Sequence, residues 1–329
     1  MAEKGLLKLD KKDKAIMQQL EENSRRSFSE IGRNIGLRSD TVEYRINRLM
    51  KSGLILRMFA EPDLDKLGLK TYRVFLKTQT DNPELETYLK KHPKAQWFAK
   101  FEGEWDYVIR YSLRNETELK KEMDALMARF GKSITAKNVV IATQQTYLPL
   151  KYITGSGLSR SIALDAGSEI ATLDETNGKI MAYLFENARM TTIDIASKLR
   201  ISPDSVQYRI KKLSEAGIIK FFGVYFNPLV FGYTRYKLLV WLQNANLEKE
   251  QGLIAYCEQH QNSAYINRIA GNWDLELDFD AKNASELHGI IKDIRDKFSD
   301  IIRDYSVLTI LDEYVPNPFG KPEKSSHHS

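Results

Sequence analysis

The stretch VEYRINRLMKSGLI (residues 42–55) decides the fold, because nearly the same stretch, VQYRIKKLSEAGII, returns at residues 206–219, 164 positions later. The likeness extends without a gap over residues 9–55 and 173–219. Repetition at a fixed offset indicates a duplicated structural unit. Identical pairs include Leu9/Leu173, Asp10/Asp174, Ile16/Ile180, Leu20/Leu184, Asn23/Asn187, Arg25/Arg189, Ile31/Ile195, Tyr44/Tyr208, Arg45/Arg209 and Gly53/Gly217.

The repetition continues downstream at an offset of 168 residues, where YLKKHPKAQWFAKFEGEWDYVIRYSL (88–113) parallels YCEQHQNSAYINRIAGNWDLELDFDA (256–281). The chain is therefore one module that occurs twice. The Gly- and Ser-containing stretch between the copies, TGSGLSRSIALDAGSEIA (154–171), is typical of a linker. Identical pairs in this region are Tyr88/Tyr256, His92/His260, Gly103/Gly271, Trp105/Trp273 and Asp106/Asp274.

Each copy begins with three short segments of helical periodicity. In the first copy a helix follows Asp10 and a second helix ends near Gly36. In the second copy Ser202 is a favourable N-cap for the third helix and Pro203 suits its first position. In the first copy we expect Ser39 to cap the corresponding helix. Three short helices joined by tight turns predict a helix-turn-helix.

The third helix has one apolar and one polar face. Its apolar residues recur at helical spacing and should pack against the other two helices; they are Val42, Ile46 and Leu49 in the first copy and Val206, Ile210 and Leu213 in the second. Hydroxyls, a tyrosine and cations on the other face suit the phosphates and base edges of a major groove. We therefore predict a DNA-binding surface made of Ser39, Thr41, Tyr44, Arg45, Arg48, Ser205, Tyr208, Arg209, Lys211 and Lys212.

Arg45 and Arg209 lie off the apolar face, so we expect replacement of either by alanine to weaken DNA binding without unfolding the protein. A competing interpretation stays open, because helical units with exposed arginine and tyrosine also serve assembly alone. The duplication favours DNA binding, since DNA-binding proteins commonly present two recognition helices to two half-sites.

Positive charge is concentrated in the two segments that hold the repeated stretch. The whole chain has a net charge of +5. Residues 1–55 carry 12 Lys and Arg against 8 Asp and Glu, and residues 173–222 carry 8 against 6. This distribution favours a polyanionic partner, although charge alone does not exclude two ordinary solvated surfaces.

Composition excludes several other classes of protein. Hydrophobic residues make up 42% and charged residues 28%, as in globular proteins, and apolar runs such as residues 238–242 are too short to span a bilayer. Cys257 is the only cysteine, which excludes an intrachain disulfide and a Cys-rich metal site. The N-terminus shows no secretory signal. We expect a cytoplasmic protein that uses no membrane, metal or cofactor.

The second part of each module predicts a ferredoxin-like domain. Its periodicity runs strand, helix, strand, strand, helix, strand, from KTYRVFLKTQ (70–79) to AKNVVIATQQTYLP (136–149) in the first copy. The fold class is therefore α+β. We expect a winged helix-turn-helix over residues 1–60, a ferredoxin-like domain over 61–152, a linker over 153–172, a second winged helix-turn-helix over 173–226, a second ferredoxin-like domain over 227–316 and a disordered tail over 317–329.

The order and spacing of these elements resemble the Lrp/AsnC (feast/famine) family of transcription regulators. The run from Ile201 to Ile219 carries the resemblance most specifically, and GEWD (103–106) and GNWD (271–274) resemble the Gly-x-Tyr/Phe-Asp turn of that family's ligand-binding (RAM) domain. The resemblance implies double-stranded DNA as a partner. It also implies a small-molecule effector, such as an amino acid, near Gly103, Trp105, Asp106, Gly271, Trp273 and Asp274.

The chain departs from the family by carrying two modules. One chain would then be equivalent to one family dimer, an intramolecular pseudo-dimer that leaves further homo-oligomerisation open, and its effector site need not be symmetric. Core packing is the alternative role for Trp105 and Trp273.

An enzyme with the same two-part architecture is the alternative reading, since siroheme decarboxylases share it. Such chemistry needs cations for substrate carboxylates and a proton donor. His92 and His260 recur at matched positions and are the candidates, although a histidine near a helix end is more often a capping or surface residue.

The differences between the copies fall mostly on the exposed side of the third helix, where Glu43, Asn47 and Arg48 correspond to Gln207, Lys211 and Lys212. We therefore hypothesise that the protein reads an asymmetric site with two unequal recognition helices.

Overall fold

The computed structural model describes residues 8–155, 157, 159–163, 170–317 and 319. The chain divides into two compact units. Each unit contains one segment from the first copy of the module and one from the second. The helix-turn-helix unit consists of the described residues of Leu7–Gly68, Ala166–Asn227 and Asn317–Ser329. The barrel unit consists of the described residues of Leu69–Asp165 and Pro228–Pro316.

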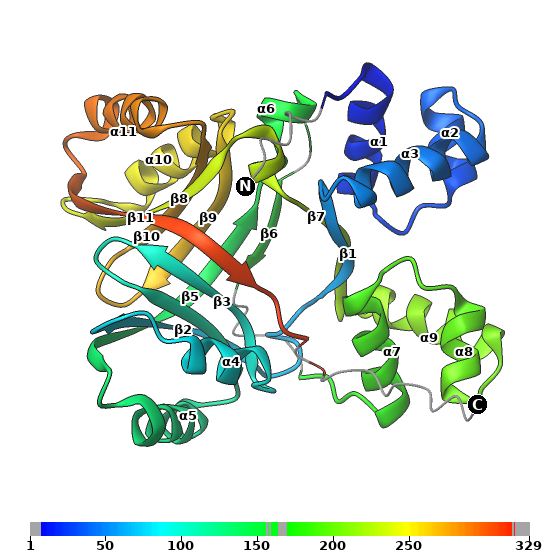
Figure 1. Ribbon diagram of the computed structural model, residues 1–329, viewed down its shortest axis with the longest axis horizontal. Helices are drawn as coiled ribbons and strands as arrows, with labels where there is room; N and C mark the ends of the chain where they lie inside the picture. The colour runs from blue at the N-terminus through cyan, green and yellow to red at the C-terminus, as the bar shows by residue number, and fades with distance from the viewer. Residues whose placement is uncertain (1–7, 156, 158, 164–169, 318, 320–329) are drawn as a thin grey trace. The chain divides into compact units, whose positions relative to one another are not determined.

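The helix-turn-helix unit contains three helices from each copy, labelled in Figure 1. They are α1 (Lys11–Glu22), α2 (Phe28–Ile35) and α3 (Ser39–Lys51), and α7 (Glu175–Glu186), α8 (Thr192–Leu199) and α9 (Pro203–Glu215). Side chains of Asp10 and Asp174 cap α1 and α7 by accepting a backbone N–H three residues later. The apolar faces expected for α3 and α9 are buried as predicted.

The starts of the two third helices differ. Ser202 caps α9 and Pro203 is its first residue, which confirms the prediction. The expectation that Ser39 caps α3 is wrong, because Arg38 occupies the N-cap position without a side-chain hydrogen bond and Ser39 is already helical. The Asp40 carboxylate instead accepts the backbone N–H of Thr41 in the first turn.

The strand that follows each recognition helix pairs with its counterpart from the other copy. β1 (Ile55–Pro62) and β7 (Ile219–Phe226) form a two-stranded antiparallel ribbon in which Phe59 lies opposite Gly223. These positions are equivalent in the repeat, so the local two-fold axis passes between them. A Cβ atom on Gly223 would lie 2.8 Å from Cζ of Phe59. The ribbon therefore fits one phenylalanine against one glycine.

The barrel unit is a closed antiparallel sheet. Each copy supplies four strands in ferredoxin order, β5-β2-β4-β3 and β11-β8-β10-β9, and the pairs β3–β11 and β9–β5 join the two sheets into a ring. The strands are β2 (Lys70–Thr78), β3 (Ala95–Glu102), β4 (Tyr107–Leu113), β5 (Ile134–Tyr147), β8 (Thr234–Leu242), β9 (Ser263–Ala270), β10 (Leu275–Ala281) and β11 (Ile302–Tyr314).

Four helices cover the outside of the ring. Figure 1 shows α4 (Pro83–Lys90) and α5 (Glu116–Phe130) on one half, and α10 (Leu247–Gln259) and α11 (Ala284–Phe298) on the other. Each pair packs on a separate apolar core. A third core lies between the two sheets and includes Phe75, Trp105, Val140, Trp273 and Leu308. Both copies contribute to it, so the expected pseudo-dimer is formed within one chain.

The space between the sheets also holds buried charges. The Arg73 guanidinium bonds Glu276 and lies 2.8 Å from the Asn267 amide oxygen. Lys237 bonds Glu276 and Asp278, and Arg235 makes a two-point ion pair with Asp280 at 2.8 and 2.9 Å; Tyr152 also donates to Asp280. Three cations thus meet three carboxylates, which is the condition for burying charge tolerably.

Parts of the expected linker and tail are structured. Residues Lys151–Thr154 form a short helix, α6, and Arg160–Ala163 form strand β6, which pairs with the end of β5. The Asn317 amide donates to the carbonyl oxygen of Ala182 on α7, and Phe319 packs against Phe185. The end of α6 and all of β6 lie in the expected linker (153–172), and Asn317 and Phe319 lie in the expected tail (317–329). Residues 156, 158, 164–169, 318 and 320–329 of these two segments lie outside the described residues.

Candidate nucleic-acid interface

α3 and α9 expose a tyrosine at the same point of the repeat. Tyr44 is 68% exposed and Tyr208 is 61% exposed, which is unusual for large aromatic side chains. The apolar face of each helix holds it in place, since Val42, Ile46 and Val206 are buried. Both tyrosines can therefore contact a partner without any rearrangement of the core.

The hydroxyl residues and cations of the predicted surface lie around these tyrosines. Ser39, Arg48, Lys211 and Lys212 are exposed, and Thr41 and Ser205 are half-buried. In α9 the ammonium groups of Lys211 and Lys212 lie 3.7 and 3.1 Å from carboxylate oxygens of Glu215. Exposed pairs of this kind contribute little to stability, so these lysines are readily available to phosphates.

Arg45 and Arg209 have a different environment from their tyrosine neighbours. The Arg45 guanidinium donates to the carboxylates of Asp10 and Asp13 at 2.7 and 2.8 Å. Arg209 donates to Asp174 and to the Asn177 side chain at 2.7 and 3.0 Å. The hydrogen bond from Arg45 is the main cause that lowers the pKa of Asp10 to about 2. Each arginine thus ties its recognition helix to the capped start of the first helix.

Arg48 shares this role in the first copy only. Its guanidinium lies 2.6 Å from the other oxygen of Asp13, whose side chain is buried. Lys212 occupies the equivalent position in α9 and bonds its own helix. The two recognition helices therefore present their cations differently.

A second repeated arginine was not assigned a role from the sequence. The Arg25 guanidinium donates to the carbonyl oxygens of Ala188 and Met190, and Arg189 donates to those of Ser24 and Arg26 at 2.9 and 2.7 Å. We call these two residues the arginine pair. Each belongs to the loop after the first helix of its copy and binds the same loop of the other copy. The sequence signal that could have revealed the pair is that the same residue, arginine, stands at matched positions of the repeat.

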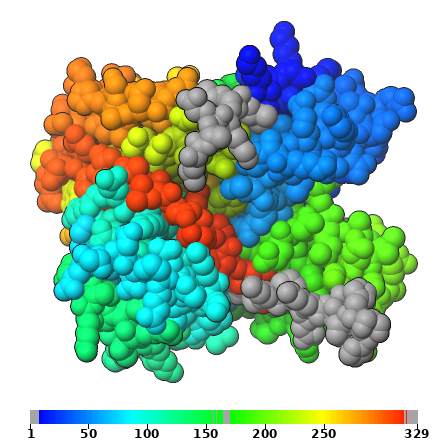
Figure 2. All heavy atoms as spheres, in the orientation of Figure 1, coloured from blue at the N-terminus to red at the C-terminus, as the bar shows by residue number. Residues whose placement is uncertain are grey.

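The cations of the ribbon strands are engaged within the molecule. The Arg57 guanidinium lies 4.4 Å from the ring centre of Phe185, and Lys220 lies 2.9 Å from a carboxylate oxygen of Asp63. In the space-filling view the atoms of the two helix-turn-helix segments, blue and green, touch on the face shown (Figure 2).

The two Gly-x-Trp-Asp turns have structural surroundings. A Cβ atom on Gly103 would lie 2.8 Å from the carbonyl oxygen of Val307, and one on Gly271 would lie 2.5 Å from Val140. Each turn therefore packs closely on a strand of the other copy. Trp105 and Trp273 are buried, and the Trp273 ring meets Phe75 edge to face at 4.6 Å.

The aspartates of these turns complete neighbouring strands. The Asp106 carboxylate accepts the backbone N–H of Thr78, and that of Asp274 accepts the backbone N–H of Leu242, both at 2.7 Å. Effector binding at Gly103, Trp105, Asp106, Gly271, Trp273 and Asp274 stays a prediction, and these six residues already have roles in joining and finishing the sheets.

His92 and His260 make the same local contact. Nδ1 of each accepts the backbone N–H two residues later, at 3.3 Å for His92 and 3.1 Å for His260. Burial lowers the pKa of both imidazoles. His92 Nε2 lies 3.1 Å from a carboxylate oxygen of Glu122. These contacts are those of residues that finish a helix end.

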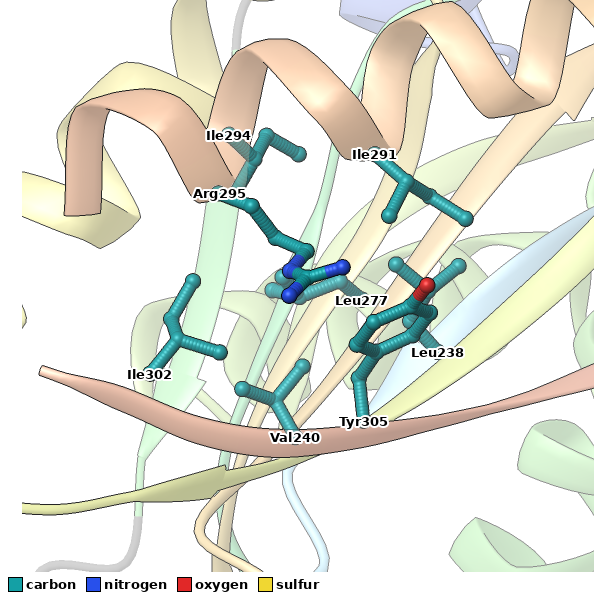
Figure 3. Close-up of a pocket in the computed structure, with 8 residues that line it drawn as sticks. All are labelled: Leu238, Val240, Leu277, Ile291, Ile294, Arg295, Ile302 and Tyr305. Carbon is teal, nitrogen blue, oxygen red and sulfur yellow. The ribbon is translucent and has the colours of Figure 1, made fainter. Parts of the chain in front are cut away.

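One pocket lies in the second half of the barrel unit, between α11 and the sheet (Figure 3). Figure 3 shows Arg295 reaching over Tyr305 among aliphatic side chains, and the guanidinium carbon is 5.2 Å from the ring centre. The lining residues are Leu238, Val240, Leu277, Ile291, Ile294, Arg295, Ile302 and Tyr305.

Two further properties concern the part of the chain that the structure describes. Within it, no helix has the length and apolar character to cross a membrane. Among the same residues, no group of three His, Cys, Asp or Glu side chains is placed to hold a metal ion.

Both helix-turn-helix segments match known families. Residues 9–50 match the AsnC-type helix-turn-helix domain, and residues 173–220 match the winged helix-turn-helix DNA-binding family. These matches define the class of protein as one built on helix-turn-helix DNA-binding domains.

Curated relatives are named as transcription regulators. An uncharacterised HTH-type transcriptional regulator of Pyrococcus furiosus is 29% identical over 118 residues, which cover 34% of this chain and 79% of the relative. The HTH-type transcriptional regulator FL11 of Pyrococcus horikoshii is 28% identical over 147 residues, which cover 44% of this chain and 97% of the relative. This chain is a tandem-duplicated relative of the Lrp/AsnC regulators, with two regulator-length modules.

Among solved structures, the fold is shared with an enzyme. The crystal structure of the siroheme decarboxylase NirDL superposes with a TM-score of 0.63 at 14% identity, covering 95% of this chain and 93% of that one. A likeness at this identity concerns the fold alone. It supports the α+β fold with two tandem modules along nearly the whole chain.

Proposed function

We propose that this protein is a transcription regulator that binds double-stranded DNA at two unequal half-sites, one contacted by α3 and the other by α9. The observation that carries the proposal is the matched exposure of Tyr44 and Tyr208 on helices whose other faces are buried. The helix-turn-helix matches and the named regulators support the DNA-binding class.

The proposal assigns different tasks to the predicted surface residues. Tyr44 and Tyr208 contact base edges or sugars, and Lys211 and Lys212 contact phosphates. Ser39, Thr41 and Ser205 lie at the N-terminal ends of the helices, where hydroxyls suit phosphate oxygens. Arg45, Arg48 and Arg209 hold the recognition helices in place and add positive charge near the DNA.

The inequality of the half-sites follows from the exposed differences between the helices. Glu43 and Asn47 on α3 correspond to Gln207 and Lys211 on α9, and all four are exposed. A carboxylate accepts from cytosine, whereas an amide can both donate and accept, so the two helices suit different bases.

Fluorescence anisotropy with random duplex DNA at low and moderate salt tests the proposal. A regulator should bind at low salt, with an affinity that falls steeply as salt rises, because phosphate contacts release counterions. An absence of binding at low salt would show that the domains serve assembly alone. Equal affinity for palindromes of either half-site would count against unequal readers.

A siroheme-decarboxylase-like activity is the second candidate, because NirDL shares the fold over nearly the whole chain. Its candidate acid groups, His92 and His260, are held by local contacts in this structure. Titration with an iron tetrapyrrole, followed in the Soret region, would reveal binding. A saturable spectral shift together with release of carbon dioxide would favour the enzyme.

We further propose that an amino acid modulates DNA binding through the barrel unit. The support is the resemblance of the Gly-x-Trp-Asp turns to the family's effector turn. Thermal-shift measurements with each of the common amino acids, followed by anisotropy with DNA, provide the test. If no amino acid changes either signal, the effector is of another class or does not exist.

A further inference from the structure

The arginine pair joins the two DNA-binding segments at one point and in one relative orientation. Arg25 lies between α1 and α2, and Arg189 lies between α7 and α8. Each guanidinium binds two carbonyl oxygens in the opposite loop. Because every bond has a directional acceptor, the pair resists rotation as well as separation.

Backbone contacts repeat the same exchange. The N–H of Ser24 donates to the carbonyl of Phe222 on β7 at 3.1 Å, and that of Ala188 donates to the carbonyl of Met58 on β1 at 2.8 Å. These bonds are equivalent under the repeat. The side chains and the ribbon thus act on the same pair of loops.

The arginine pair is not a surface decoration. Both guanidinium groups are half-buried, and burial lowers the pKa of each. Arg189 lies over the ring of Phe28 at 4.2 Å, and Arg25 lies over that of Phe222 at 5.9 Å. The cost of removing these groups from water is offset by carbonyl oxygens and aromatic faces.

We propose that the arginine pair fixes the distance between α3 and α9 and thereby sets the half-site spacing that the protein accepts. This inference rests on the proposed DNA-binding function. Each recognition helix follows directly on the second helix of its copy, so movement of the loop moves the helix that reads DNA. Arg25 and Arg189 are positioning residues, because they act through α3 and α9.

The first test needs no DNA. Spin labels are placed at the matched exposed positions by Asn47→Cys and Lys211→Cys in the full chain. Burial raises the pKa of the Cys257 thiol to about 12, so labelling is confined to the introduced cysteines. Double electron–electron resonance should give one narrow distance distribution. Arg25→Gln/Arg189→Gln should broaden it; an unchanged distribution would overturn the proposal.

The second test measures spacing on DNA. Duplexes enriched from a random pool by the wild-type chain are compared with versions whose half-sites are moved by two base pairs. The wild type should lose about 100-fold in affinity, because both helices can no longer engage together. The double variant should lose less than about tenfold. Equal losses would overturn the proposal.

Two controls separate positioning from folding. Arg26→Gln removes a neighbouring arginine that bonds Glu22 within its own copy, and it should leave both readouts unchanged. If the glutamine variant does not fold, Arg25→Lys/Arg189→Lys takes its place. It keeps the charge but not the two-point geometry, so it should also broaden the distance distribution. If the wild type enriches no sequence while the variant broadens the distances, the DNA-binding function fails and the spacing role fails with it.

Discussion

Tyr44 and Arg45 are neighbours on α3, yet their side chains have different surroundings. The tyrosine projects into solvent, whereas the arginine bonds the carboxylates of Asp10 and Asp13. The same division holds for Tyr208 and Arg209. The arginine holds its helix in place, and the exposed tyrosine is the residue that we propose contacts DNA.

Replacement of the tyrosines should therefore weaken DNA binding alone. We expect Tyr44→Ala or Tyr208→Ala to reduce the binding free energy by about 1–3 kcal/mol for the selected duplex. The unfolding free energy should change by less than about 0.5 kcal/mol, because both side chains are exposed. Anisotropy and thermal unfolding measure the two effects. Wild-type affinity in both variants would exclude these tyrosines as contacts.

Replacement of the arginines should lower stability as well, while the expected weakening of DNA binding stays a prediction. Arg45→Ala leaves the buried carboxylate of Asp13 with Arg48 as its remaining ion-pair partner, beside the backbone N–H of Asp10. We expect the free energy of unfolding to fall by about 1 kcal/mol and the midpoint of thermal unfolding to fall by about 2–5 °C. Arg33, exposed on α2, supplies the control variant Arg33→Ala. If Arg45→Ala melts like that control, the tie is not stabilising.

The two matched histidines should make stability depend on pH. Their pKa values are lowered by burial below the ordinary 6.5, so the unfolded chain binds protons more readily than the native one. The contribution of the two neutral histidines to the free energy of unfolding is fully present above about pH 6.5. It is lost as the pH falls through their pKa values in the native state.

His92→Asn keeps a local acceptor but does not titrate. Between about pH 7.5 and 5.5, its thermal midpoint should fall by about 2–4 °C less than that of the wild type. His288→Asn, at an exposed position on α11, is the control. Parallel curves for wild type and His92→Asn would refute this account.

At the scale of elements, α3 and α9 present their charges unequally. Lys211 and Lys212 are exposed and contact Glu215 on their own helix, where Lys212 also lies over the Tyr208 ring, whereas Arg48 is held by Asp13 on α1. α9 should therefore contribute more of the salt-dependent binding.

Neutralisation of α9 tests this difference. Lys211→Gln/Lys212→Gln should reduce the slope of log affinity against log salt by about 2, and Arg48→Gln by about 1 or less. The slopes come from anisotropy titrations at several salt concentrations. An equal reduction by the two variants would contradict an unequal division of phosphate contacts.

Elements with strong local signals were predictable from the sequence. The apolar faces of α3 and α9, the cap at Ser202 and the βαββαβ order all follow from periodicity and capping within short segments. The prediction that Ser39 caps α3 was wrong. A capping serine would have to stand one position earlier, at the N-cap, and the sequence has Arg38 there. The start of a helix without a capping side chain leaves little trace in a sequence.

Contacts between the copies were not predictable in the same way. Glu276, Asp278 and Asp280 alternate along β10, and such alternation ordinarily marks a solvent-facing side of a strand. In the structure this side faces the other sheet and is neutralised by Arg73, Arg235 and Lys237. The arginine pair is equally non-local, because its partners lie in the other copy. Pairing between distant segments is decided by tertiary contacts that no local window contains.

At the scale of the whole molecule, the two copies are complementary. Arg73 in the first copy meets Glu276 in the second, and Phe59 meets Gly223. Two first copies would bring Arg73 against Val108, which occupies the position of Glu276 in the repeat, and phenylalanine against phenylalanine. The sequence differences therefore favour pairing within the chain.

A charge reversal tests this complementarity. Arg73→Glu should destabilise the barrel unit by about 3–5 kcal/mol, because it removes one of the two cations paired with the buried Glu276 and places a further carboxylate beside it. Arg73→Glu/Glu276→Arg should recover part of that loss. Thermal unfolding measures both, and Lys120→Glu, at the exposed Lys120–Asp124 pair, is the control. If the double variant is no more stable than Arg73→Glu, the two residues are not coupled.

Closure of the barrel also has a consequence for biosynthesis. β3, made early on the ribosome, obtains its second neighbour only when β11 has been made, more than 200 positions later. Until then the nascent first half carries an open strand edge, which is a template for aggregation. The chain should therefore depend on chaperones during translation, and ribosomes stalled before β11 should yield an aggregating product.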